Sequence, residues 1–211
     1  MDVPGFNGVV DIYHHNTISS VAKMKQDGVI AVVHKATEGR DYRDERYPER
    51  KHQFKSAGFK WGGYHFSSGA NPLLQVENFL QYAAPEPDEL ICLDYEPSSS
   101  GANMTYGQMI EFINLIHQEI GRYPVVYGGH LLREAVKDVT NSILSNCPLW
   151  YARYASAPYR IPSIWQTWTL WQYTDGNAGP LKPHMVEGIG HCDRDTFNGT
   201  QQELLQRWPF S

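Results

Sequence analysis

Cysteine, long apolar runs and clustered positive charge are all scarce in this sequence. Its 211 residues include 3 cysteines, Cys92, Cys147 and Cys192, and this odd, widely spaced set predicts neither a disulfide framework nor a cysteine metal site. The longest wholly apolar run, at 29–33, is far shorter than the roughly 18 residues of a membrane span. Lys and Arg number 18 against 23 Asp and Glu, and they form no basic run. These absences argue against a membrane partner and against a nucleic-acid partner.

The sequence also lacks any sign of a second structural unit. It has no internal repeat, no linker rich in glycine and serine and no low-complexity tail, so we expect a single domain over residues 1–211. Residues 1–4 lack the basic and then apolar character of a signal peptide. We therefore expect synthesis in the cytoplasm, and we expect a monomer.

Aromatic residues, by contrast, are abundant, with 13 Tyr, 6 Trp and 8 Phe. Rings with a polar tip suit a surface that binds sugars, but they suit a large hydrophobic core equally well. The cluster of Trp165, Trp168 and Trp171 shows the same ambiguity. Both interpretations stay open at this point.

Short β-branched or aromatic runs alternate with amphipathic segments, a pattern typical of βαβ units and a parallel sheet. The strands are expected at 8–13, 28–36, 62–66, 90–96, 123–128, 149–154, 170–173 and 194–197. Helices are expected between the first five strands, whereas Pro158, Pro162 and Ser163 indicate that loops join the last three. The predicted fold class is α/β, a single irregular TIM-like β/α barrel with about five β/α units followed by three strands with short connections.

Two of the predicted helices carry clear end signals. Thr105 and Gln108 form a capping box, and Gly121 supplies a stop at the other end of that helix. Asn71 and Pro72 are typical of the start of an earlier helix, because they supply a cap and a preset first turn.

The most informative acids follow the fourth predicted strand. The segment 91–97 passes from apolar residues into Asp94 and Glu96, and Pro97 ends the strand. Residues i and i+2 share one face of a strand, so both carboxyls are expected to enter one pocket, with Cα atoms about 6.6 Å apart. Two acids held together repel, which favours one of them staying protonated. Such a pair is what glycoside hydrolysis uses.

Further acids are expected at the same place. Asp11 ends the first predicted strand, and Asp193 and Asp195 belong to the last. Active sites of α/β barrels lie at the C-terminal ends of the strands, so these carboxyls should converge on one barrel mouth. An isolated Asp-x-Glu is common in solvated loops, and it is this convergence that favours a site.

Blocks of sequence along nearly the whole chain match a known pattern. The most specific are Lys-Ala-Thr-Glu-Gly at 35–39 and Asp-Tyr-Glu at 94–96, and others lie at 8–11, 63–66, 123–127, 149–154, 170–174 and 193–199. With these blocks the chain resembles glycoside hydrolase family 25, the Chalaropsis-type lysozymes (muramidases) found in many phage endolysins and bacterial autolysins. The resemblance implies cleavage of the β-1,4 bond between N-acetylmuramic acid and N-acetylglucosamine in peptidoglycan.

The same resemblance implies roles for individual residues. Glu96 matches the general acid/base, and Asp94 matches the neighbouring carboxylate that stabilises the acetamido group of the substrate. The substrate-binding residues that it implies are Asp11, Glu38, Tyr64, Tyr127, Tyr151, Trp171, Gln172 and Asp193. The chain departs from the family after Asp11, where Asp-x-Ser-x-x-Gln is replaced by Asp-Ile-Tyr-His-His-Asn at 11–16.

No metal and no other cofactor is expected. His14 and His15 lie near Asp11, and His191 lies near Asp193, but neither set has a recognised ligand spacing. We expect these histidines to lie in the groove or on the surface.

Two alternatives to a lysozyme remain. A family 18 chitinase also ends a strand in Asp-x-Glu, but its Asp-x-x-Asp-x-Asp-x-Glu motif would need an acid at Cys92. A catalytically silent glycan-binding module is the other alternative, and the presence of both Asp94 and Glu96 disfavours it. The expected partner is a peptidoglycan glycan strand, which the protein would reach after release by a holin, by lysis or by a secretion apparatus.

Overall fold

The computed structural model describes residues 3–99 and 101–210. The first part of the chain alternates strands with helices: β1 (Phe6–Ile12), α1 (Val21–Gln26), β2 (Ala31–Glu38), β3 (Tyr42–Arg43), α2 (Tyr47–Ser56), β4 (Lys60–Phe66), α3 (Pro72–Ala83), β5 (Leu90–Asp94), α4 (Tyr106–Ile120), β6 (Val125–Gly128) and α5 (His130–Val136). The remainder comprises the 3-10 helix η1 (Ile143–Asn146), β7 (Leu149–Ala152), β8 (Leu170–Thr174), β9 (Met185–Val186), β10 (Gly190–His191), β11 (Asp193–Phe197) and α6 (Gln201–Arg207).

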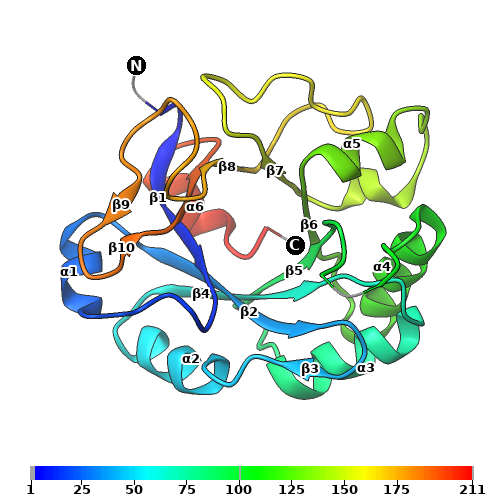
Figure 1. Ribbon diagram of the computed structural model, residues 1–211, viewed down its shortest axis with the longest axis horizontal. Helices are drawn as coiled ribbons and strands as arrows, with labels where there is room; N and C mark the ends of the chain where they lie inside the picture. Colours follow the sequence, from blue (N-terminus) through cyan, green and yellow to red (C-terminus); the bar gives the residue numbers. More distant parts are fainter. Residues whose placement is uncertain (1–2, 100, 211) are drawn as a thin grey trace.

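Most of the strands form a closed barrel. Within the described ranges, a nine-stranded sheet has the order β1-β11-β8-β7-β6-β5-β4-β2-β3, and β1 also pairs with β2. That extra pairing closes a ring from which only β3, a short extension beside β2, is excluded. The predicted α/β barrel is therefore confirmed, with β9 and β10 as a separate small hairpin (Figure 1).

The helices and loops around the barrel follow the predicted division. The units β1-α1, β2-α2, β4-α3, β5-α4 and β6-α5 come first, and β7, β8 and β11 follow without full helices between them. Figure 1 shows α2, α3, α4 and α5 along the lower and right-hand sides of the barrel, while the irregular segment 153–169 (yellow) crosses its upper side. Among the described residues, no helix is long and apolar enough to cross a membrane.

The direction of β11 was not predicted. This strand runs antiparallel to both of its neighbours, β1 and β8, whereas the remaining pairs of the ring are parallel. No full helix returns the chain to the far end of the barrel after β8, so the chain re-enters from the end that it has just left. Asp193, at the start of β11, consequently lies opposite Asp11 of β1.

The end signals of the helices are confirmed. The Thr105 hydroxyl accepts from the backbone N–H of Gln108, whose side chain reaches back to complete the capping box. Gly121 ends α4 with a φ of 71°, a left-handed conformation that glycine adopts without strain. The start of β2 differs from the prediction, since Gly28 has a φ of 89° in the preceding turn and the strand begins at Ala31.

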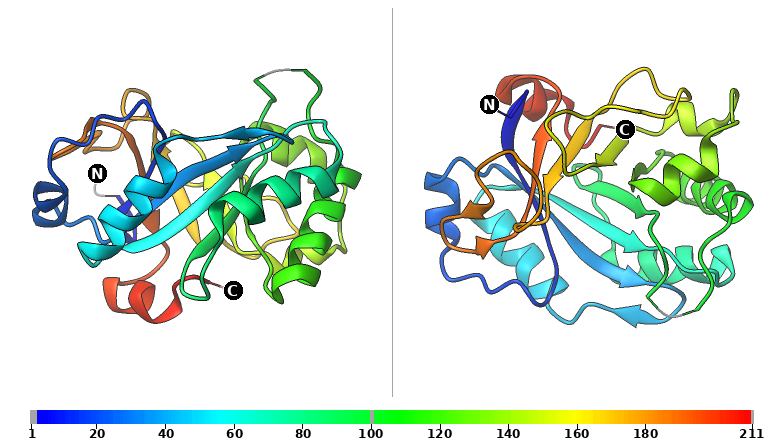
Figure 2. Two further views of the ribbon diagram at one scale, coloured as in Figure 1. Left: turned by 90° about the horizontal axis from the view of Figure 1, so that it is seen from below. Right: turned by 45° about the horizontal axis from the view of Figure 1, so that its top comes forward.

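Side chains of the barrel strands alternate between two cores. Inward-facing residues such as Val33, Leu90 and Val125 fill the barrel, and Leu204 and Trp208 pack into the same cluster. Outward-facing residues pack against the surrounding helices. In the left view of Figure 2, α6 (red) lies at the bottom and the loop that follows β5 (green) lies at the top. The helix α6 thus closes the end of the barrel opposite to that loop.

Candidate active site

A pocket, which we call the central pocket, opens at the C-terminal end of the parallel strands. Every strand of the closed ring contributes at least one side chain to its lining. The residues predicted from the sequence that line it are Asp11, Tyr64, Asp94, Glu96, Tyr127, Gln172 and Asp193. The predicted convergence on one mouth is therefore present for the acids at the ends of β1 and β5 and for Asp193 at the start of β11, whereas Asp195, also expected there, is buried and does not line the pocket.

Asp94 and Glu96 enter the central pocket from β5 and the residues after it. Leu90 and Cys92 belong to the inner core while Leu93 belongs to the outer one, so the inward face of the strand continues through Asp94 to Glu96. Asp94 is only 6% exposed, whereas Glu96 is half-buried and also borders a second cavity near the start of α5. Glu96 thus lies between the central pocket and this second cavity, whereas Asp94 lines only the central pocket.

The environment of this pair favours a single shared charge. Burial, followed by the charges of Glu96 and Asp11, raises the pKa of Asp94 well above its usual value. Burial also raises the pKa of Glu96. The ammonium of Lys35 acts in the opposite direction on the pKa of Asp94, but burial and the neighbouring acids outweigh it, so the pair is held to at most one negative charge near neutral pH.

A hydrogen-bond network centred on Gln172 forms the floor of the pocket. Its Nε2 donates to Oδ2 of Asp11 at 2.8 Å. Its Oε1 accepts from the hydroxyls of Tyr127 at 2.8 Å and Tyr154 at 2.7 Å. These bonds fix which way the amide of Gln172 points, and they leave Asp11 held from one side.

Asp193 adds another carboxyl to the pocket. Burial and the charge of Asp11 opposite it raise the pKa of Asp193 to about 9. Lys35 is the cation that lines the central pocket among the described residues, and its Nζ lies 2.5 Å from Oε2 of Glu38. One lysine cannot balance all of these acids, so several of them keep their protons at neutral pH.

Two predicted substrate-binding residues, Tyr151 and Trp171, lie elsewhere. Both are fully buried in the outer core between the barrel and the surrounding segments. The Tyr151 hydroxyl donates to the carbonyls of Tyr159 and Arg160, and the Trp171 indole N–H donates to the carbonyl of Arg153 at 2.7 Å. They are corrected to core residues, because neighbours in a strand point to opposite faces and their neighbours occupy the inner one.

Glu38 is the third predicted residue that does not line the central pocket. It lines an adjacent cavity together with Tyr42 and Ser68. Burial acts to raise the pKa of Glu38, but hydrogen bonds from Lys35 and Ser99 outweigh it and lower that pKa. Glu38 is therefore an ionised partner of Lys35 at the border of the pocket, not an acid of its floor.

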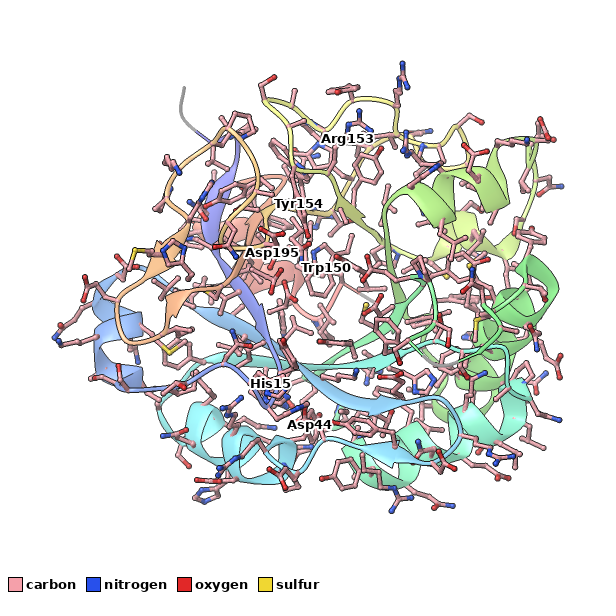
Figure 3. The ribbon with its side chains drawn as sticks, in the orientation of Figure 1. His15, Asp44, Trp150, Arg153, Tyr154 and Asp195 are labelled. Carbon is pink, nitrogen blue, oxygen red and sulfur yellow. The ribbon has the colours of Figure 1, made fainter. Side chains whose placement is uncertain are left out.

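Several residues of the pocket were missed in the sequence. They are Tyr13, Lys35, Phe66, Cys92, Trp150 and Tyr154. Figure 3 shows Trp150, Tyr154 and Asp195 close together within the ring of strands. Alternation along β7 makes Trp150 and Tyr151 face opposite sides, but only the pairing of Ala152 with the inward-facing Gln172 shows that Trp150 is the inner one.

The loop at 13–16 is firmly anchored beside the pocket. The backbone N–H of His14 donates to Oδ2 of Asp44 at 3.0 Å, and its Nδ1 lies 2.9 Å from the same oxygen. Arg50 donates to the carbonyls of Tyr13 at 2.7 Å and Asn16 at 2.5 Å. His15 and Asp44 appear near each other in the lower half of Figure 3. His14 thus serves to hold the loop.

One acidic group lies outside the pocket. Glu86, Asp88 and Glu89 are close enough together to hold a cation, and they form the one such group among the described residues. Lys51 and Lys55 already form ion pairs with it. The group is accounted for as a surface network of ion pairs.

Comparison with known proteins places this geometry in a family. An alignment 219 positions long with "Lysozyme M1" of Streptomyces globisporus is 28% identical and covers 97% of this chain and 71% of that protein. A bacterial lysozyme from Streptomyces coelicolor superposes with a TM-score of 0.80 at 27% identity, covering 97% of each chain. A family GH25 lysozyme from Aspergillus fumigatus gives 0.80 at 29% identity, covering 95% of this chain and 97% of that one.

A family model decides the assignment. The model described as glycosyl hydrolases family 25 matches residues 10–180, which run from β1 to beyond β8 and carry most of the central pocket. The chain therefore belongs to glycosyl hydrolases family 25 and is a glycoside hydrolase.

Proposed function

We propose that the protein is a lysozyme that hydrolyses the β-1,4 bond between N-acetylmuramic acid and N-acetylglucosamine in bacterial peptidoglycan. The observation that carries the proposal is the placement of Asp94 and Glu96 together in the lining of the barrel mouth, where burial raises the pKa of both carboxyls. The relatives named as lysozymes support the choice of substrate.

Glu96 acts as the general acid in this proposal. It is the more exposed of the two acids and borders two cavities, so a glycosidic oxygen that bridges these cavities lies within its reach. Glu96 donates its proton to that oxygen as the bond to the sugar carbon breaks. The leaving sugar takes the proton, and Glu96 then accepts one from the attacking water.

Asp94 acts as the stabilising carboxylate. Its Oδ1 is buried and has no hydrogen-bond partner among the described residues, so it can accept from an N–H group of the substrate, such as that of an acetamido group. Its negative charge lies beside the sugar carbon as positive charge develops there. Asp11, Gln172 and Asp193 form the polar floor beneath the ring, and Tyr64 and Tyr127 offer ring faces and hydroxyls beside it.

The test is Glu96→Gln, which keeps the shape of the side chain but removes its proton transfer. We expect release of reducing ends from purified peptidoglycan to fall by about 10²–10⁴-fold, because that is the usual contribution of general acid catalysis. Glu119→Gln, an exposed change on α4, is the matched control and should leave the rate unchanged. Near wild-type activity of Glu96→Gln would refute the assignment.

The same material distinguishes the alternatives. Mass spectrometry of the products should show a new reducing end on muramic acid. Release from chitin in place of peptidoglycan would indicate a chitinase-like enzyme. Binding to peptidoglycan without any product would indicate a silent glycan-binding module.

A further inference from the structure

Asp195 is a buried acid that the proposed mechanism does not use. It lies on β11 at 0% exposure and does not line the central pocket, whereas Asp11 does. Its Oδ1 accepts from the indole N–H of Trp150 at 2.6 Å. Its Oδ2 receives no hydrogen bond from an N–H or hydroxyl group of the described residues.

The carboxyl of Asp11 is the partner left for that oxygen. Asp193 is the register partner of Asp11 and Asp195 lies two residues further along β11, so Asp11 and Asp195 are diagonal neighbours on the same face of an antiparallel pair, where their carboxyls interact. An ionised carboxylate only accepts hydrogen bonds, so two carboxyls can bond to each other only when one of them carries a proton. On its other side Asp11 accepts from Gln172, so it is held between Gln172 and Asp195.

The surroundings offer no cation that would allow both acids to ionise. The groups that face Asp195 or act on its charge are Asp11, Cys92, Trp150, Gln172, Tyr173, Cys192, Asp193 and Arg194. Only Arg194 is positive, and its guanidinium is turned away to the carbonyl of Met185 at 2.6 Å and to Asp27 at 3.7 Å. Burial raises the pKa of Asp195 to about 8 and the pKa of Asp11 well above its usual value.

We propose that Asp195 and Asp11 hold one proton between them, and that Asp195 is thereby a positioning residue, which aims Asp11 at the sugar bound in the central pocket. The shared proton removes the repulsion that would push the two carboxyls apart. Asp11 then keeps its bond to Gln172 and its place in the pocket lining. The positioning half of this proposal rests on the proposed lysozyme function, whereas the shared proton does not.

The presence of the shared proton is tested by measuring the Tm of the wild type and of Asp195→Asn as a function of pH. The amide keeps an acceptor for Trp150 and supplies a permanent N–H for Asp11, so it imitates the shared-proton state without being able to ionise. The unfolded wild type releases this proton above the ordinary pKa of Asp, while the folded protein keeps it to about pH 8. Wild-type stability is thus present in full at low pH and is lost as the pH rises.

We therefore expect the Tm of the wild type minus that of Asp195→Asn to fall steadily from pH 5 to pH 8. One retained proton changes the folding equilibrium by about tenfold per pH unit, or about 3–5 °C in Tm for a chain of this length. Asp138→Asn, which removes an exposed carboxyl, is the control for the loss of one formal charge. A Tm difference for Asp195→Asn that stays constant across this range would overturn the shared proton.

Kinetics test the positioning role. Asp195→Asn should keep kcat and KM within about threefold of the wild type, because the hydrogen bonds of Asp11 and Trp150 survive. Asp195→Ala should lower kcat/KM by about tenfold or more, because it leaves both groups without that partner. Equal losses in the two variants would overturn the positioning role. Absence of lysozyme activity in the wild type would remove the proposed function, while the Tm series would still decide the shared proton.

Should Asp195→Asn fail to fold, ¹³C NMR of the aspartate carboxyls in the wild type replaces the Tm series. A buried carboxyl that stays protonated above pH 7 supports the shared proton. Complete ionisation of all aspartates by pH 6 overturns it.

Discussion

Adjacent residues within β7, and likewise within β8, face opposite sides of the barrel wall. Trp150 faces the central pocket while Tyr151 faces the outer core, and Gln172 and Trp171 repeat the arrangement one strand away. The aromatic excess thus serves both of the purposes that composition left open. The cluster of Trp165, Trp168 and Trp171 belongs to the outer core, and the pocket draws on other rings.

A matched pair of substitutions tests this division. Trp171→Phe replaces a fully buried indole by a smaller ring and removes its hydrogen bond to the carbonyl of Arg153, so the free energy of unfolding should fall by about 1–3 kcal/mol with KM unchanged. Tyr127→Phe removes one hydroxyl from Gln172, so kcat/KM should fall by about 3–10-fold with a smaller loss of stability. Urea unfolding and initial rates on peptidoglycan measure both. The opposite pattern would mean that the facing of these strands is misassigned.

At the scale of elements, β5 was predictable and β11 was not. The acids after β5 follow from a two-residue period within a single segment, and that period places Asp94 and Glu96 on one face whatever the rest of the chain does. The direction of β11 depends instead on how 175–192 crosses the barrel end, which no local pattern encodes. The position of Glu38 outside the central pocket was not predictable for a related reason. It depends on the ion pair with Lys35, and a register shift in β2 separates the two residues.

The loop at 13–16 is an element whose geometry is set from a distance. Arg50 of α2 holds two of its carbonyls and also contacts Nε2 of His34 at 3.0 Å. Tyr13 lines the pocket, so the contacts that Arg50 of α2 makes with this loop also position part of the pocket lining.

Arg50→Met should loosen that loop while keeping most of the apolar stem. We expect the free energy of unfolding to fall by about 1.5–3 kcal/mol, the worth of hydrogen bonds to a charged group, and KM to rise more than kcat falls. Arg46→Met, an exposed change on the same helix start, is the control. Hydrogen exchange of residues 13–16 reads the loop directly. Unchanged exchange and unchanged KM would show that the anchor has no bearing on the site.

At the scale of the whole molecule, charge sets a condition on the enzyme's approach to its substrate. The chain has a net charge of −5, and bacterial cell walls are themselves anionic. Salt shortens the reach of that repulsion from about 30 Å at 0.01 M to about 10 Å at 0.1 M.

Activity on intact cell walls should therefore rise with ionic strength over that range. Short soluble fragments of the same glycan, which carry few charges, should show a weaker dependence. Turbidity clearing and fragment cleavage, followed in parallel, measure the two. A flat profile on intact walls would show that the net charge has no part in the encounter.

The closure of the barrel finally sets the order in which parts of the molecule can fold during synthesis. β1 is among the first segments to be synthesised, yet one of its two neighbours is β11, and Thr196 bonds back to the carbonyl of Pro4. A growing chain cannot complete the ring until residue 197 has left the ribosome. Asp11 meets neither Gln172 nor Asp195 before then. Barrel closure and assembly of the pocket floor are therefore one late event, so a nascent or prematurely ended chain carries the acids of β5 without the floor beneath them.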